Sequence, residues 1–153
     1  MYRHIETYRG FVYPGGADHK GRVSHSFFAQ RFDEASRQFM AFLGLSPAVL
    51  APRDHGAIAV EQRTERKRDV LEGGLLHIAT ELLDLGARHL SFVHRMYDSE
   101  TMEEVARAEF LGVCFDSIAG VSIEMPELTR AHAMGLLIGT DHPALPLRRP
   151  AAA

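Results

Sequence analysis

One carboxylate, Asp18, stands in a short polar segment directly ahead of a long apolar stretch of the chain. A carboxyl group with an ordinary pKa of about 3.9 is ionised at neutral pH, and an ionised carboxylate can attack an electrophilic carbon or take a proton from water. Asp18 is therefore a candidate nucleophile or general base. Aspartate ahead of a helix also forms turns and caps, so a purely local role is the alternative.

A helix is predicted to follow this carboxylate. Apolar residues recur at steps of three and four and form one stripe along it: Phe28, Phe32, Ala35, Phe39 and Phe42. Ser24 or Ser26 is expected to cap its start, and Gly44 to end it. The first turn of a helix has unpaired N–H groups and the positive end of the helix dipole. The backbone N–H of His25 or Ser26 could therefore stabilise the oxygen of a reacting carbonyl, as an oxyanion hole does.

Other residues could support such a site. Gly21 is expected to adopt a positive φ in the loop, or to be a plain turn residue. A run of cations follows later in the chain: Arg63, Arg66, Lys67 and Arg68. This run either forms a charged strand edge that discourages aggregation, which is slightly favoured, or holds phosphate groups. Arg88 and His89, at the next turn, could contribute to the phosphate site.

The remaining chemistry-bearing residues predict no further site. Cys114 lies between two apolar residues and is expected to be a buried, inert thiol. The nine histidines show no zinc-binding spacing, although Asp18, His19 and His25 could be forced into a cluster. Glycine-rich phosphate loops and the GxSxG motif are absent from the sequence. We therefore predict neither a metal ion nor a resident cofactor.

One long helix and several strands must position these residues. Besides the helix, the pattern predicts a strand over 4–13, a connector over 46–55, a strand from 57 into the charged run, strands over 75–85, 89–97 and 105–115, and a short helix from Pro126. The last long strand is expected to carry a bulge near Phe110 and Leu111. This order predicts an α+β fold with a single helix against an antiparallel sheet.

Four segments, in this order, resemble a known enzyme family. They are DHKGRVSHSFF at 18–28, FDEAS at 32–36, GARHLSF at 86–92 and IEMPEL at 123–128. An Asp, two residues and a Gly ahead of an aromatic helix that carries a Glu is the pattern of the hotdog-fold acyl-CoA thioesterases. The chain is most similar to the 4-hydroxybenzoyl-CoA thioesterase branch, and the resemblance covers most of its length.

The resemblance implies a hotdog domain over 1–139, in which a curved antiparallel sheet wraps a long central helix, with a loose tail over 140–153. It also implies an enzyme that hydrolyses a small or medium acyl-CoA, with coenzyme A as part of the substrate. Asp18 and the backbone N–H of His25 would be catalytic. The supporting residues would be Gly21, Ser24, Ser26 and Glu34. Relatives pair their open sheet edges, so a homodimer is expected, with a homotetramer as the larger assembly.

Two other functions stay open. Four residues differ from those usual in active relatives: Gly15, Gly16, Arg22 and Ser24. These differences fit a hotdog protein that binds acyl-CoA or another ligand without hydrolysing it. His19 and Glu34 could instead imitate the catalytic pair of a hotdog dehydratase, although the order around Gly21 fits the thioesterase motif better.

Length and composition agree with a small enzyme. The 153 residues allow one domain, and 46% hydrophobic with 24% charged residues excludes a disordered or fibrous chain. A net charge of −3 does not favour nucleic acid as a partner. One cysteine forms no internal disulfide, which predicts a reducing cytoplasm. Neither a membrane span nor a secretory signal is predicted.

Overall fold

A computed structural model describes residues 4–15 and 17–137 of the chain. The elements, in order, are β1 (His4–Phe11), α1 (His25–Phe42), α2 (Pro47–Leu50), a single 3₁₀ turn (Ala51–Arg53), β2 (His55–Arg66), β3 (Leu75–Leu85), β4 (His89–Asp98), β5 (Glu104–Asp116), β6 (Val121–Ile123) and α3 (Glu127–Met134). The predictions for Gly16 and for the tail over 140–153 lie outside the described residues. No described helix has the length and apolar character needed to cross a membrane.

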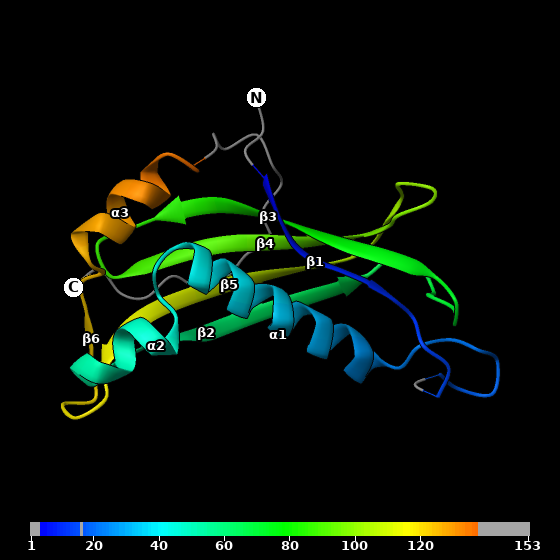
Figure 1. Ribbon diagram of the computed structural model, residues 1–153, viewed down its shortest axis with the longest axis horizontal. Helices are drawn as coiled ribbons and strands as arrows, with labels where there is room; N and C mark the ends of the chain where they lie inside the picture. Colours follow the sequence, from blue (N-terminus) through cyan, green and yellow to red (C-terminus); the bar gives the residue numbers. More distant parts are fainter. Residues whose placement is uncertain (1–3, 16, 138–153) are drawn as a thin grey trace.

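The strands form one sheet in the order β1-β3-β4-β5-β2, and β6 pairs with the end of β5. Every pair is antiparallel. Figure 1 shows α1 lying across one face of this curved sheet. The predicted α+β architecture, one long helix against a curved antiparallel sheet, is confirmed. β2 has a single neighbour along its length, β5, so it is an edge strand of the described sheet.

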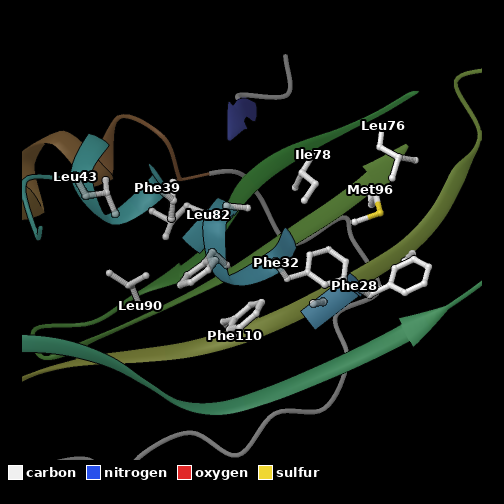
Figure 2. Packing of buried hydrophobic residues seen from close by; sticks show 14 of the residues in the cluster. Phe28, Phe32, Phe39, Leu43, Leu76, Ile78, Leu82, Leu90, Met96 and Phe110 are labelled. Atoms are coloured by element: carbon white, nitrogen blue, oxygen red, sulfur yellow. The ribbon is translucent and has the colours of Figure 1, made fainter. Parts of the chain in front are cut away.

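The core lies between α1 and the inner face of the sheet. Phe28, Phe32, Ala35 and Phe39 are all buried, as the apolar stripe predicts. Figure 2 shows Phe32 and Phe39 pointing from the helix toward Leu82, Leu90 and Phe110 of the sheet. Phe42, the last residue of the predicted stripe, is 43% exposed and contacts the ring of His132 in α3, at 4.7 Å between ring centroids. The stripe therefore ends one turn earlier than predicted.

No bulge lies at Phe110 and Leu111 of β5, where one was predicted: the register shift opposite them belongs to β2, and the irregularity of β5 itself lies at Val105, against β4. The register between β2 and β5 shifts between Ala59 and Glu61, so the extra residue is Val60 of β2, opposite Leu111 and Gly112. In β5 itself, both faces are buried around Phe110. A strand buried on both faces loses its alternation without any bulge, and this produced the wrong assignment.

The connector over 46–55 contains more structure than predicted. Ser46 precedes the short helix α2, and Pro47 occupies the first position of that helix, where its missing N–H costs nothing. β6 was not predicted because it has only three residues. α3 begins directly after Pro126, as expected. Together α2, β6 and α3 lie at the end of the sheet opposite the start of α1 (Figure 1).

Candidate active site

Asp18 lies in a tight loop that its own carboxylate stabilises. Oδ1 accepts hydrogen bonds from the backbone N–H groups of Lys20, at 2.8 Å, and Arg22, at 3.1 Å. Oδ2 accepts from the Arg22 guanidinium, with N–O distances of 3.1 and 3.0 Å. Gly21 has φ +77° and donates to the Asp18 carbonyl, which confirms its predicted positive φ. Asp18 thus forms a turn, the local alternative, and a catalytic role would be additional to it.

These donors favour the ionised form of Asp18. The backbone N–H of Arg22 has the largest effect and lowers the pKa of the carboxyl, slight desolvation opposes it, and Lys20 and the Arg22 guanidinium lower the pKa further. A carboxylate with a low pKa is a weak general base, but it is fully charged at neutral pH and available to attack a carbonyl carbon. In the sequence Arg22 stands out only as a departure from the family pattern, and nothing there indicates its pairing with Asp18.

The start of α1 has the geometry of an oxyanion site. Ser24 is the N-cap in extended conformation, and its hydroxyl accepts from the N–H of Phe27 at 3.4 Å, so the predicted cap is confirmed. The Ser24 and Ser26 hydroxyls are 2.8 Å apart. In the described part of the chain, the N–H groups of His25 and Ser26 have no acceptor. Two N–H groups at the positive end of the helix dipole are therefore available to a ligand.

An open cavity of about 600 Å³ joins the loop to the start of α1, and we call it the basic cavity. Asp18 and Ser24 line it together with the end of β2 and the residues that follow; the others are Arg22, Val23, Arg66, Lys67, Arg68 and Asp69. The Asp18 side chain is 38% exposed. Asp18, the N-cap residue Ser24 and part of the basic run therefore line one cavity.

The basic run keeps unused hydrogen-bond donors in this cavity. The Arg66 guanidinium lies over the ring of Phe28, 4.6 Å from its centroid, and its ion pair with Asp69 is long, at 3.7 Å. Arg68 pairs with Glu103 at 2.8 Å and is largely exposed. A guanidinium has five N–H donors, so one ion pair leaves others available for phosphate oxygens. Arg66 and Arg68 therefore keep donors in this cavity that could bind phosphate oxygens, as the phosphate-binding alternative needs.

Arg88 and His89 do not join this cavity. Arg88 donates to the Ser122 carbonyl at 3.1 Å, and the His89 ring is 3.3 Å from an Asp84 oxygen. Both lie where β4 begins, whereas the basic cavity lies at the end of the sheet where β4 stops at Asp98. At about 3.3 Å per residue the strand separates these ends by roughly 30 Å. Within one chain Arg88 and His89 therefore lie apart from the basic run, which the sequence did not reveal, and their predicted part in CoA binding stays a prediction.

Glu34 also lies apart from Asp18 in the described structure. It is on the exposed side of α1, where its carboxylate is 3.5 Å from the guanidinium of Arg31. It lines neither the basic cavity nor the second cavity described next. Within one chain Glu34 is therefore not placed to support Asp18, and its predicted supporting role stays a prediction.

A second cavity, of about 640 Å³, runs between α1 and β2. We call it the apolar cavity, since most of its walls are carbon: Ala29, Met40, Leu45, Leu50, Ala57, Ile58, Leu90, Phe92 and Phe110 are among them. Ser36 also lines it, and its hydroxyl is hydrogen-bonded to the buried His94. Sequence analysis missed this cavity. The signal was His94 itself, a polar residue among the inward-facing positions of an otherwise apolar strand.

The two negative expectations concern cysteine and metal chemistry. Cys114 is buried, and burial raises the pKa of its thiol to about 11, so the prediction of an inert thiol is confirmed. Among the described residues, no group of three or more potential ligands is arranged to hold a metal ion.

Known proteins identify the family and the fold of this chain. A model of the thioesterase-like superfamily matches residues 12–132. The betainyl-CoA thioesterase of Pseudomonas aeruginosa is 26% identical over 145 residues, which cover 94% of this chain and 89% of that protein.

Two solved structures share the fold. A Staphylococcus aureus protein crystallised with CoA aligns with a TM-score of 0.83 at 14% identity and covers 98% of both chains. A 1,4-dihydroxy-2-naphthoyl-CoA thioesterase from Synechocystis aligns with a TM-score of 0.76 at 20% identity, covering 92% of this chain and 99% of the other. At these identities the likeness establishes the fold, which is the hotdog fold predicted from the sequence.

Proposed function

This chain belongs to the thioesterase-like superfamily and is a thioester hydrolase, and we propose that it cleaves the coenzyme A thioester of a small or medium acyl group at the basic cavity. Both named thioesterases above act on CoA thioesters by their names, and the Staphylococcus aureus neighbour was crystallised with CoA. The observation that carries the proposal is the meeting of Asp18, the N-cap residue Ser24 and Arg66 in one cavity. A cytoplasmic location belongs to the same proposal, because the single cysteine is a buried free thiol.

In the proposed reaction the thioester carbonyl binds against the start of α1. Its oxygen accepts hydrogen bonds from the N–H groups of His25 and Ser26, which strengthen as the oxygen gains charge. A carboxylate oxygen of Asp18 attacks the carbonyl carbon, a C–O bond forms, and the C–S bond breaks to release the thiolate, which takes a proton from solvent. Water then hydrolyses the mixed anhydride to the free acid and restores Asp18.

The lowered pKa of Asp18 keeps the carboxylate ionised for attack on the carbonyl carbon and for general-base activation of water alike, so labelling has to separate the two routes. The two routes differ in where solvent oxygen first enters. In ¹⁸O-water, water that attacks the Asp18 carbon of the mixed anhydride leaves the label in the Asp18 carboxylate, whereas water that attacks the acyl carbon labels only the acid product. Label found in Asp18 therefore identifies nucleophilic attack by the carboxylate. General-base catalysis never labels the enzyme.

The phosphates of coenzyme A are proposed to bind Arg66 and Arg68. Both side chains line the basic cavity and retain free donors beyond their ion pairs. Guanidinium groups match phosphate geometry with two parallel hydrogen bonds, which makes arginine well suited to this role. The thiol end of the substrate would then lie between the basic run and Asp18, with the acyl group directed along α1.

A homodimer is part of the proposal, because β2 is an exposed edge with apolar residues. Ile58 is 54% exposed and Val60 is 51% exposed on this strand. Pairing of two β2 strands would continue the sheet, cover these side chains and close the outer side of the apolar cavity. Light scattering during gel filtration tests this: a dimer or a dimer of dimers supports the proposal, and a monomer at micromolar concentration contradicts it.

The experiment that tests the function is thiol release from a panel of acyl-CoAs. Asp18→Asn keeps the size of the side chain and removes its charge, and Asp18→Glu keeps the charge and moves it. We expect the wild type to turn over at least one acyl-CoA and Asp18→Asn to lose about 10²-fold or more in kcat, which corresponds to roughly 3 kcal/mol. Equal rates would contradict the role of Asp18, and saturable binding without turnover would favour the non-hydrolytic alternative.

A further inference from the structure

A chain of hydrogen bonds crosses the core and ends at the apolar cavity. The Ser36 hydroxyl is 2.8 Å from Nε2 of His94, and Nδ1 of His94 is 2.6 Å from the hydroxyl of Thr80. Thr80 is 2.8 Å from the hydroxyl of Thr7, which donates to the carbonyl of Ile78 at 3.4 Å. His94, Thr80 and Thr7 are buried, whereas Ser36 lines the cavity.

The proton order used below takes the Ile78 carbonyl, 3.4 Å from the Thr7 hydroxyl, as the acceptor at one end of this chain, and the imidazole ¹⁵N measurement below decides between this order and its reverse. A carbonyl only accepts, so Thr7 uses its one proton there and must accept from Thr80. Thr80 has then used its own proton and must accept from Nδ1–H of His94. The neutral imidazole has one N–H, so its Nε2 is an acceptor, and Ser36 donates to it. The Ser36 oxygen therefore faces the cavity with lone pairs and no free proton.

A hydroxyl that donates to an imidazole is also the arrangement of a serine nucleophile and its base. Here the imidazole is a poor base. His94 is fully buried against Phe32, Phe92 and Phe110, and this desolvation lowers its pKa to about 3. An imidazole with that pKa does not hold the proton of Ser36 at neutral pH. Ser36 therefore stays a hydroxyl and acts as a hydrogen-bond acceptor.

The cavity is mostly apolar, and Asp33 and Arg37 in its lining form an ion pair with each other. The nitrogen–oxygen distance of this pair is 3.0 Å, and both side chains are mostly exposed. Binding sites of this kind are largely hydrophobic, with a few placed polar groups that orient the ligand. A ligand that fills the cavity without a donor opposite Ser36 leaves that oxygen unpaired, which costs free energy.

The position of Ser36 along α1 sets the length of such a ligand. Ser36 follows His25 by eleven residues, which is about 16 Å along a helix at ~1.5 Å per residue. C–C bonds of ~1.5 Å advance an extended zigzag roughly 1.25 Å each, so about a dozen carbon atoms span that distance. We propose that Ser36 is a specificity-determining residue that accepts a hydrogen bond from a hydroxyl or other donor near the far end of a medium-chain acyl group. This inference rests on the proposed binding of the thioester at the start of α1.

The test compares two acyl-CoAs whose acyl chains have the same number of non-hydrogen atoms, 12-hydroxydodecanoyl-CoA and 11-methoxyundecanoyl-CoA. The hydroxyl compound has a donor at its end, and the methoxy isostere has an acceptor alone. We expect the wild type to favour the hydroxyl compound over its methoxy isostere roughly tenfold in kcat/KM, the size of one net hydrogen bond. In Ser36→Ala this ratio should fall to about one. A wild-type ratio near one, or a ratio unchanged in Ser36→Ala, would overturn the proposal.

Thr80→Val is the second variant, and it separates recognition from a merely structural role. Without an acceptor on Thr80, Nδ1 of His94 loses its partner and the proton moves to Nε2, which then donates to Ser36. Ser36 regains a free proton for the cavity, so the preference should shift toward the methoxy compound. Imidazole ¹⁵N shifts report the tautomer: Nδ1–H in the wild type and Nε2–H in the variant. A wild-type Nε2–H tautomer would also overturn the proposal.

A binding experiment distinguishes failure of this inference from failure of the proposed function. If no acyl-CoA is hydrolysed, the apolar cavity can still be titrated with 12-hydroxydodecanoate and with dodecanoate. Tighter binding of the hydroxy acid by the wild type than by Ser36→Ala supports the role of Ser36 without any catalysis. Equal binding of the two acids by both proteins would contradict it.

Discussion

His94 should make this protein sensitive to acid, and the size of the effect follows from its burial. The folded protein keeps the imidazole neutral, with a pKa of about 3, while the unfolded chain binds a proton below the ordinary pKa of 6.5. Acid therefore stabilises the unfolded state. The contribution of the neutral His94 to the free energy of unfolding is fully present above about pH 6.5 and is lost as the pH falls toward 3. Between pH 7 and pH 4.5 these two values give a loss of about 2–3 kcal/mol in the free energy of unfolding.

His94→Phe is the matched perturbation, because the ring lies among Phe32, Phe92 and Phe110. At pH 7 the variant should be destabilised by about 1–3 kcal/mol, since Thr80 loses a partner in the core. At pH 4.5 it lacks the protonation penalty, so the difference from the wild type should shrink or change sign.

Urea unfolding at both pH values measures this. Carboxylates and the buried His77, whose pKa desolvation also lowers, contribute acid sensitivity of their own. These contributions are common to the wild type and His94→Phe, so they cancel when the two proteins are compared. His25→Gln changes an exposed histidine and is the control, whose loss of stability should equal that of the wild type. If the wild type and His94→Phe lose the same stability between pH 7 and pH 4.5, the account of a buried neutral imidazole is refuted.

Three further predictions follow from the site and the core. Arg22→Gln removes a partner that lowers the pKa of Asp18, so the acid limb of the kcat/KM profile should move to higher pH; an unmoved limb would show that Asp18 does not titrate in it. Arg68→Gln should raise KM roughly tenfold for acyl-CoAs, about one charged hydrogen bond, but not for N-acetylcysteamine thioesters, which lack the phosphates; equal effects on both would exclude phosphate binding. Phe39→Ala should lower the free energy of unfolding by about 3–5 kcal/mol, measured in urea, whereas Phe42→Ala should cost far less because that ring is half exposed.

Local patterns predicted most of the elements and the centre of the site. The spacing from Phe28 to Phe39 was enough to place α1 and its buried face, and the Asp18 motif identified the loop that faces the start of this helix. These features depend on residues close together in the chain. The helix is therefore visible in periodicity and capping, and the loop in its resemblance to the thioesterase motif.

What the sequence left open depends on how distant segments meet. The pattern could not place Arg88 and His89 at the far end of the sheet, because strand direction relative to the basic run is a property of the topology. It could not show that Arg22 pairs with Asp18 or that His94 links Ser36 to Thr80. Each of those contacts is set by side-chain direction in three dimensions. A histidine on an apolar strand face was nevertheless visible as a local inconsistency, and such positions are where functional or specifying groups are expected.

A crystal structure with a thioether analogue of an acyl-CoA, in which a ketone replaces the thioester carbonyl, tests the central claim most directly. We predict that the ketone oxygen lies within hydrogen-bond distance of the N–H of His25 or Ser26, that a carboxylate oxygen of Asp18 faces the ketone carbon, and that the phosphates contact Arg66 or Arg68. A ketone bound away from the start of α1, with Asp18 engaged only by Lys20 and Arg22, would contradict the account.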